Sequence, residues 1–225
     1  MKPLILTAYS KSHESLFFEH FYPSLQETGM RRKVDIMIPT IDKQQGEFGE
    51  SIFNAYMKRL MERFMDILEQ QEGRLVIHCG CDMRFYQDII PEIEEKAAQY
   101  ELVSIDDNYK FLCADFFAFI VTPRIIEMYR KTIEIEKFAA NNEIAFNHVM
   151  QEMRMNTLAL GHEYWTVGLS NGGVRWNQGD HVEPPHGMKL HHANFTVGGE
   201  NKMALLNLVK DLHDKQMASG LANVD

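Results

Sequence analysis

Cysteine is scarce in this sequence, and its few positions argue against a disulfide framework. The 225 residues contain three cysteines, Cys79, Cys81 and Cys113. An odd number cannot pair completely, and Cys79 and Cys81 lie too close along the chain for an ordinary structural bridge. Reduced thiols are typical of proteins in the cytosol. We therefore expect a cytoplasmic protein.

Long basic runs and long apolar runs are also missing. The formal net charge is -9, and the longest basic run is RRK at 31–33. Nucleic-acid binding depends on Lys and Arg that neutralise phosphates, so the composition argues against a nucleic-acid partner. No apolar run approaches the roughly 20 residues of a membrane helix, so we expect no transmembrane segment. The N-terminal MKPLILTAYS predicts a first strand and not a signal peptide.

Short apolar runs alternate with amphipathic segments along most of the chain. Strand-like runs occur at PLILTAY, KVDIMIPT, RLVIHC, ELVSI and FLCADFFAFIVT. Between the second and third of these, Tyr56, Leu60, Phe64 and Leu68 mark the apolar face of a long helix. Strands that alternate with helices predict an α/β fold with a mostly parallel central sheet flanked by helices.

An aspartate directly follows one of the predicted strands. The stretch VIHCGCDMRFYQDI places Asp82 just beyond the apolar run LVI at 75–77. In α/β sheets, ligands bind beyond the carboxyl ends of the strands. Asp82 is therefore either a turn carboxylate that bonds its own backbone or an oxygen ligand for Mg²⁺ or Mn²⁺.

A second group of ligand-type residues lies between His162 and Lys202, in a region long and irregular enough to predict a functional loop system. The stretch HHANFTVGGENK at 191–202 combines two histidines, an asparagine, two glycines and a lysine. Glycine lets the backbone approach a ligand, histidine can complete a Mn²⁺ shell, and lysine can meet a phosphate as a point charge. The alternative is a polar loop whose histidine packs in the core.

Three motifs, in their order along the chain, resemble those of the nucleotide-diphospho-sugar transferases, glycosyltransferases of the GT-A fold. GCD at 80–82 stands in the place of the family's Asp-x-Asp tripeptide, and NEIAFN at 142–147 is similar to its Asp-Gln-x-x-x-Asn helix segment. The most specific match is HANFTVG at 192–198 with Lys202, which is similar to the family's His-Ala-Asn-aromatic-x-x-Gly and the lysine that follows. The resemblance begins at about Leu75 and reaches the tail, whereas the first third matches only as a nucleotide-binding βαβ pattern.

The resemblance implies an enzyme that moves a hexosyl or pentosyl group from a nucleotide-diphosphate donor to a glycan or other hydroxyl acceptor. It implies a single GT-A-like domain over residues 1–225, with a nucleotide-binding half at 1–110 and an acceptor-binding half at 111–225. Asp82 and His192 would hold the assisting Mn²⁺ or Mg²⁺. Because Gly80 stands in place of the first carboxylate of the tripeptide, one of the family's acidic groups is missing, and metal dependence is open to question.

The resemblance also assigns residues to the donor and to catalysis. The donor would contact the end of the first strand and the motif residues, namely Thr7, Ala8, Tyr9, Gly80, Asp82, Asn194, Gly198 and Lys202. An inverting reaction needs a carboxylate near the acceptor oxygen as general base. The candidates are Asp115, Asp180 and Glu143, which stands where the family has glutamine.

Two other functions agree with the sequence. The missing carboxylate at Gly80 fits a degenerate domain that binds a nucleotide sugar without turning it over. Alternatively, His78, Cys79, Cys81 and the histidine loop belong to a zinc or thiol module. Structural zinc normally takes four ligands in recognisable pairs, and a single Cys-x-Cys does not supply them.

Overall fold

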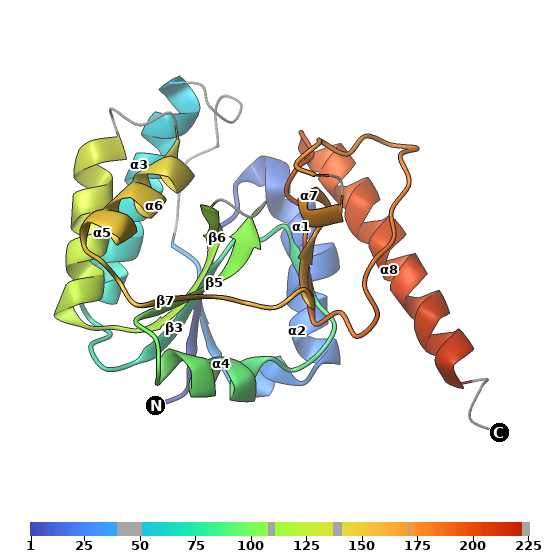
Figure 1. Cartoon of the computed structure of the whole chain (residues 1–225), viewed down its shortest axis with the longest axis horizontal. Coiled ribbons are helices and arrows are strands. Elements are labelled where there is room, and N and C mark those ends of the chain that lie inside the picture. Colours follow the sequence, from blue (N-terminus) through green and yellow to red (C-terminus); the bar gives the residue numbers. More distant parts are fainter. Residues whose placement is uncertain (40–50, 108–110, 137–140, 171, 222–225) are drawn as a thin grey trace.

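A six-stranded sheet with helices on both faces forms the centre of the molecule (Figure 1). The computed structural model describes residues 1–225 except 40–50, 108–110, 137–140, 171 and 222–225. The strand order is β2-β1-β3-β6-β5-β7. In that order the strands span Asp35–Met37, Leu4–Leu6, Leu75–Cys79, Phe111–Ile120, Leu102–Asp107 and Thr157–Ala159.

The sheet is mostly parallel, as the sequence predicted. β1 is parallel to β2 and β3, and β5 is parallel to β7. β6 runs antiparallel to both of its neighbours, β3 and β5. The carboxyl ends of β1 and β3 therefore lie at the same edge of the sheet as the first half of β6.

Alternation along the strands divides the core into two layers. Leu4 and Leu6 face α3 (Ser51–Leu68), α5 (Pro123–Glu136) and α6 (Asn142–Glu152). Ile5 faces the opposite layer, which is covered by α4 (Ile90–Ala97), η2 (Phe17–Phe21), α2 (Tyr22–Glu27) and η3 (Met30–Arg32). η1 (Lys11–His13) and α1 (Glu14–Leu16) precede these helices, and Leu16 packs in a separate apolar cluster. Each large apolar side chain buried here contributes about 1.5–3 kcal/mol, so both layers hold the sheet rigid beneath its edge.

A second, three-stranded sheet occupies part of the region predicted to be irregular. β8 (Tyr164–Thr166) is parallel to β9 (Leu190–His192), and β9 is antiparallel to β4 (Met83–Phe85). α7 (Val167–Ser170) follows β8, and α8 (Gly199–Leu221) packs against this sheet through a separate apolar cluster. The strands of this second sheet, MRF, YWT and LHH, do not lie within the longer apolar or alternating runs that identify a strand in a sequence.

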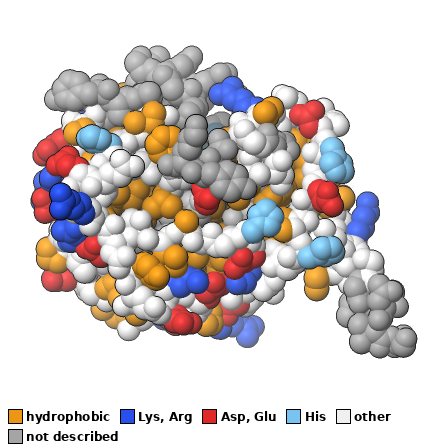
Figure 2. Space-filling view, in the orientation of Figure 1, with side chains coloured by type: hydrophobic (Ala, Val, Ile, Leu, Met, Phe, Trp, Pro, Cys, Tyr) orange, Lys and Arg blue, Asp and Glu red, His pale blue; other side chains and the backbone are white. Residues whose placement is uncertain are grey.

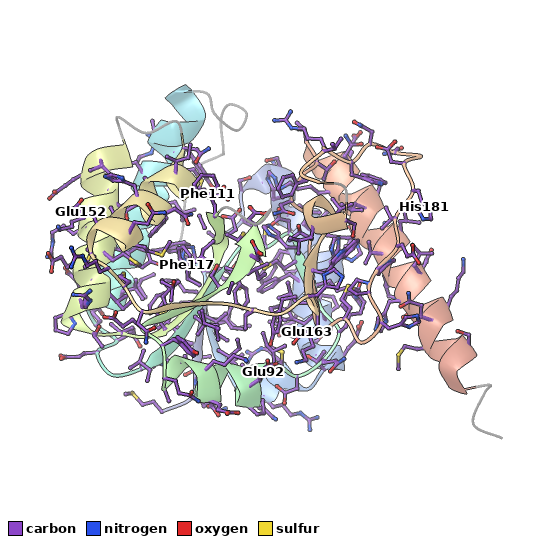
Figure 3. The ribbon with its side chains drawn as sticks, viewed as in Figure 1. Glu92, Phe111, Phe117, Glu152, Glu163 and His181 are labelled. Carbon is purple, nitrogen blue, oxygen red and sulfur yellow. The ribbon has the colours of Figure 1, made fainter. Side chains whose placement is uncertain are left out.

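Lys189 joins the second sheet to α4. Its ammonium lies 2.7 Å from Glu92 Oε2 and 3.2 Å from Glu163 Oε1. Figure 3 shows these two glutamates near each other at the lower side of the molecule. Tyr164 also donates its hydroxyl proton to Glu92 Oε2 at 2.8 Å. This network fixes the position of the sheet whose strands lead into the site described below.

The charged side chains on the face drawn in Figure 2 are of both signs. Lys and Arg are interspersed there with Asp and Glu. None of the helices in the described ranges is long and apolar enough to cross a membrane.

Candidate active site

The connection between β3 and β4 places Asp82 at the edge of the main sheet. This connection consists of Gly80, Cys81 and Asp82. The carbonyl of Asp82 accepts a hydrogen bond from the amide of Ala193 at 2.9 Å, which ties the connection to the end of β9. The carboxylate is buried, with 8% of the side chain exposed. Asp82 thus lies beyond the end of a buried strand, where the sequence placed it.

Two basic side chains lie against the Asp82 carboxylate. The ammonium of Lys202 contacts Oδ2, and Nε2 of His192 lies 3.4 Å from Oδ1. Burial opposes ionisation of Asp82, but Lys202 and His192 outweigh it and hold the pKa of Asp82 well below its usual range. Burial likewise disfavours the charged forms of both partners, and Asp82 outweighs it and raises the pKa of Lys202 and of His192. Lys202 and His192 thus face the Asp82 carboxylate together, and the ammonium of Lys202 is a point charge that an anionic ligand could also meet.

His192 is oriented by its strand and by a thiol. In the β4–β9 register it is the partner of Met83, next to Asp82. Its Nδ1 lies 3.5 Å from Sγ of Cys113, so Nε2 faces the carboxylates. That nitrogen is buried and makes no hydrogen bond with the described residues. Its second carboxylate neighbour is Asp115, whose Oδ2 lies 3.9 Å away.

The donor atoms of this cluster fit a divalent cation in their chemistry. A carboxylate from Asp82 and an imidazole nitrogen from His192 are ligands that Mn²⁺ accepts. Across the described ranges, however, no three His, Cys, Asp or Glu side chains are placed so that they could hold a metal together. An ion at Asp82 and His192 would therefore take its remaining ligands from the diphosphate of a donor or from water.

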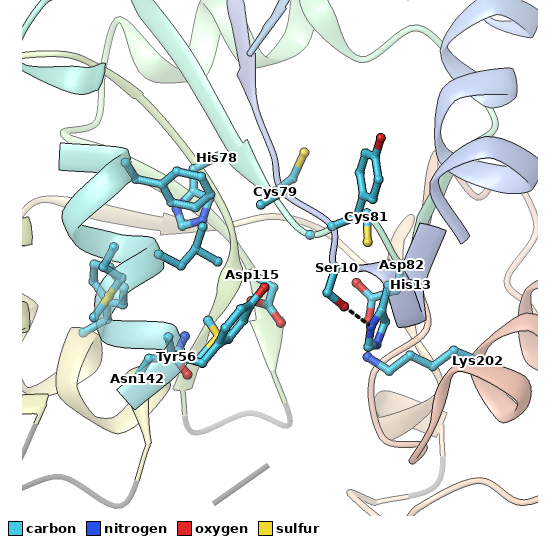
Figure 4. Close-up of a pocket in the computed structure, with 18 residues that line it drawn as sticks. Ser10, His13, Tyr56, His78, Cys79, Cys81, Asp82, Asp115, Asn142 and Lys202 are labelled. Atoms are coloured by element: carbon cyan, nitrogen blue, oxygen red, sulfur yellow. Dashed lines mark hydrogen bonds and ion pairs between the residues drawn. The ribbon is translucent and has the colours of Figure 1, made fainter. Parts of the chain in front are cut away.

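A pocket opens beside the cluster, between α3 and the edge of the sheet (Figure 4). One wall is apolar and comes from α3, through Tyr56, Met57, Leu60, Met61 and Phe64. The other side is polar and includes Ser10, His13, Asp82, Asp115 and Lys202. An apolar wall that faces a few convergent polar groups is the usual composition of a ligand site.

Ser10 and His13 are site residues that the sequence analysis missed. The Ser10 hydroxyl lies 3.1 Å from Nδ1 of His13, and both line the pocket. Burial, and then the nearby Lys202, lowers the pKa of His13, so its neutral form is favoured. The sequence contained a pattern that could have identified them. The polar run SKSH directly follows the predicted strand PLILTAY, and ligands bind at the carboxyl ends of such strands.

The residues predicted at the end of the first strand divide into two groups. Ala8 and Tyr9 line the pocket. Thr7 is fully buried and does not line it, and its amide donates to the carbonyl of Met37 at 3.2 Å. The ring of Tyr9 is stacked on Phe17 with centroids 4.6 Å apart. A nucleotide base could therefore contact only the part of the Tyr9 ring that Phe17 does not cover.

Asn194 and Gly198 do not line the pocket but shape its surroundings. Asn194 Nδ2 donates to Asp107 Oδ1 at 2.9 Å. Gly198 has a φ of 85°, a left-handed conformation that favours glycine. Its carbonyl accepts a hydrogen bond from the amide of Lys202 at 3.1 Å. Gly198 thus sets the start of α8, the helix that carries Lys202 into the site.

The comparisons with known proteins concern the three-dimensional structure. No family model and no curated protein matches the sequence. The structure is similar to a glycosyltransferase involved in the glycosylation of the major capsid of PBCV-1, with a TM-score of 0.60 and 7% identity. That similarity covers 92% of this chain and 100% of the other. The chain has the GT-A glycosyltransferase fold.

Two further GT-A neighbours agree with this assignment. GlyE of Streptococcus pneumoniae TIGR4 has a TM-score of 0.55 and 14% identity, over 98% of this chain and 64% of GlyE. An active-site mutant of LgtC has a TM-score of 0.53 and 10% identity, over 84% of this chain and 86% of that one. At these identities the likeness establishes the fold, and the residues of the site must be judged from their own geometry.

Of the three predicted general bases, the GT-A fold brings Asp115 into the pocket. Glu143 does not line it and is hydrogen-bonded to Asp107 instead. Burial, and then this bond, raises the pKa of Glu143 to about 9, so the carboxyl is protonated at neutral pH. Asp180 is exposed in a turn, where its Oδ2 accepts a hydrogen bond from the amide of Asn177 at 2.8 Å. Asn142, which was not predicted, lines the pocket beside α3.

The residues of the alternative zinc or thiol module, His78, Cys79 and Cys81, are buried but also line the pocket (Figure 4). Nδ1 of His78 lies 2.7 Å from the hydroxyl of Tyr129, and burial lowers the pKa of His78 to about 3. Cys79, Cys81 and Cys113 are free and buried, and burial raises the pKa of all three thiols. High thiol pKa values disfavour the thiolate that binds metals and reacts. This arrangement gives no support to the zinc or thiol alternative.

Proposed function

We propose that this protein is a glycosyltransferase that moves a sugar from a nucleotide-diphosphate donor to the hydroxyl of a glycan or another acceptor. The observation that carries the proposal is the cluster of Asp82, Lys202 and His192 at the edge of a GT-A sheet, beside a pocket with an apolar wall. Among the structural neighbours, LgtC is a galactosyltransferase solved in complex with donor and acceptor sugar analogues. LgtC, a neighbour with this fold, therefore binds donor and acceptor analogues.

Each part of the pocket matches one part of such a donor. The base would lie against the α3 wall and the backbone of Ala8 and Tyr9. The diphosphate would lie at Lys202, whose ammonium has three N–H donors and can contact phosphate and Asp82 together. Asp82 and His192 would hold Mn²⁺ or Mg²⁺, and the ion would supply positive charge at the leaving diphosphate.

The reaction is a displacement at the anomeric carbon. The acceptor oxygen forms a bond to this carbon as the bond from the carbon to the diphosphate oxygen breaks. The nucleoside diphosphate leaves with the electron pair, and the hydroxyl proton passes to a base or to solvent. Lys202 stabilises the departing negative charge, because a cation fixed in a largely buried site needs little reorganisation.

A thermal-shift screen tests the proposal. The protein is melted with UDP-, GDP-, CMP- and dTDP-sugars, each with and without MnCl₂, and the release of nucleotide is then measured. We expect one donor class to raise the melting temperature, since a ligand of the native state stabilises it by mass action. Stabilisation without release of nucleotide would favour the non-catalytic binding domain. No stabilisation by any of the donors would contradict both.

We also place the protein in the cytoplasm. The three buried free thiols support this location, since an oxidising compartment favours disulfides. Fractionation of cells that express the tagged full chain tests it, and recovery with an exported fraction would contradict it.

A further inference from the structure

Position 80 lacks the carboxylate that the Asp-x-Asp pattern would place there, and the structure shows what fills the space. A Cβ atom on Gly80 would lie 2.7 Å from Oδ1 of Asp82, 3.6 Å from Cβ of Asp115 and 3.9 Å from Cγ of Asp115. The backbone of Gly80 is not left-handed, so its conformation alone does not require glycine. A side chain at position 80 would thus displace the Asp82 carboxylate and would also lie in van der Waals contact with the Asp115 side chain.

The strand register explains this position. β3 and β6 are antiparallel, with Cys79 opposite Phe116, and the amide of Gly80 donates to the carbonyl of Asp115 at 2.8 Å. Gly80 and Asp115 are therefore direct cross-strand neighbours. Facing residues of an antiparallel pair project on the same side of the sheet, with Cβ atoms roughly 4.5–5.5 Å apart. The carboxylate of Asp115 consequently reaches the same side of the sheet as a side chain at position 80 would.

The Asp115 carboxylate is available to a ligand. Its side chain is 46% exposed and lines the pocket, whereas only 8% of the Asp82 side chain is exposed. Within the described ranges its oxygens accept no hydrogen bond, and the His192 Nε2 lies 3.9 Å away. An ionised carboxylate offers about four acceptor sites, so most of its capacity faces the pocket.

We propose that Asp115 supplies from β6 the carboxylate that position 80 lacks on β3, and that it accepts hydrogen bonds from the bound donor. These bonds come from the ribose hydroxyls or from water on the donor's cation. The inference rests on the proposed function and deepens it. The acidic pair of this site then spans two neighbouring strands, Asp82 at the end of β3 and Asp115 on β6, and Asp115 binds the donor and does not serve as general base.

Calorimetric titrations with UDP, GDP and dTDP, in MnCl₂ and in EDTA, test this assignment. For the diphosphate that binds the wild-type protein, we expect Asp115→Asn to lose roughly tenfold or more in affinity, as for a lost hydrogen bond to a charged group. A loss in both media assigns the contact to the ribose, and a loss in MnCl₂ alone assigns it to the water shell of the ion. The control Asp211→Asn, on the exposed face of α8, should bind as the wild type does.

A conservative variant at the same position makes the test more stringent. Asp115→Glu keeps a carboxylate on β6, and we expect it to retain more affinity than Asp115→Asn. Unchanged affinity in Asp115→Asn overturns the inference, and so does an Asp115→Glu variant that melts like the wild type but loses as much affinity as Asp115→Asn. If the Glu variant does not fold, the Asn variant alone decides. If none of the three diphosphates binds the wild type, it is the proposed function that fails.

Discussion

Lys202 and Asp82 are 120 residues apart in the sequence, yet the ammonium of Lys202 contacts the carboxylate of Asp82 in the floor of the pocket. The two side chains come from the first turn of α8 and from the end of β3. Burying such charges is costly unless each has a partner. The pair is therefore both a structural link between α8 and the main sheet and a fixed source of charge for a ligand.

Replacement of Asp82 by Asn should impair both stability and donor binding. The variant leaves Lys202 and His192 without their counter-charge, which we expect to cost about 2–4 kcal/mol of unfolding free energy. Urea denaturation measures this cost, and titration with the donor found in the screen measures binding. Asp211→Asn, an exposed change on α8, is the control. A fully stable Asp82→Asn variant with wild-type affinity would contradict the site.

Lys202→Met should weaken the binding of nucleoside diphosphates and spare that of the nucleosides. The variant removes the cation that we place at the diphosphate but keeps a side chain of similar length. We expect a loss of roughly tenfold or more, as for other charge-assisted hydrogen bonds. Lys210→Met is a matched control, since Lys210 lies on the same helix and pairs with Asp214 at the surface, 2.6 Å away. Equal losses of affinity for nucleoside and diphosphate would contradict the assignment.

His192→Ala should reduce the response of donor binding to manganese. Titration of the donor complex with MnCl₂ measures the apparent metal affinity, which we expect to fall by roughly 10- to 100-fold when this nitrogen is lost. His181→Ala, at an exposed histidine of the loop region (Figure 3), should leave the titration unchanged. An identical metal response in wild type and His192→Ala would remove His192 from the proposed ligands.

The stability of Glu143→Gln relative to the wild type should increase as the pH rises. Burial and the bond to Asp107 raise the pKa of Glu143 to about 9, from an ordinary value of 4.5. Between these values the native state holds a proton that the unfolded chain releases, so rising pH favours unfolding of the wild type. Glutamine carries no such proton. Melting temperatures at about pH 5 and about pH 8 test this, and an equal difference at both would contradict it.

Tyr129→Phe should destabilise the core without changing the donor site. The variant removes the hydroxyl that lies 2.7 Å from Nδ1 of His78 and leaves that buried nitrogen without a partner. We expect a loss of about 1–3 kcal/mol in unfolding free energy, measured by urea denaturation. Donor affinity should remain, because Tyr129 does not line the pocket and the His78 ring, which does, is unchanged. Zinc that is bound stoichiometrically by the wild-type protein and lost in this variant would revive the zinc module.

The sequence predicted the main sheet because its strands lie within recognisable apolar or alternating runs, although β1, β2 and β7 themselves are only three residues long. RLVIHC corresponds to β3 and FLCADFFAFIVT to β6, and the apolar face of Tyr56, Leu60, Phe64 and Leu68 belongs to α3 and is buried in the core. The second sheet was missed because its strands, MRF, YWT and LHH, do not lie within such runs. Local patterning cannot identify such strands, which depend on their partners.

The site was predicted less completely, since a sequence shows where strands end but not which residues face each other across them. The motifs grouped Asp82, His192 and Lys202, and these three side chains lie together in the structure. Thr7 is buried and does not line the pocket, and its contact with a donor stays a prediction. That Asp115 lies opposite Gly80 depends on the β3–β6 register, which pairs residues more than thirty positions apart and leaves no trace in either segment alone.

The pairing of β9 with β4 also decides which of two adjacent histidines can reach a ligand. His192 sits opposite Met83 and faces Asp82, whereas His191 sits opposite Arg84 and packs against the ring of Trp165 inside the protein. Side chains alternate between the two faces of a strand, so inserting or deleting one residue in β9 would exchange their places. The two histidines therefore cannot substitute for each other, and because all three residues of β9 are buried, a change of length in this strand should be poorly tolerated.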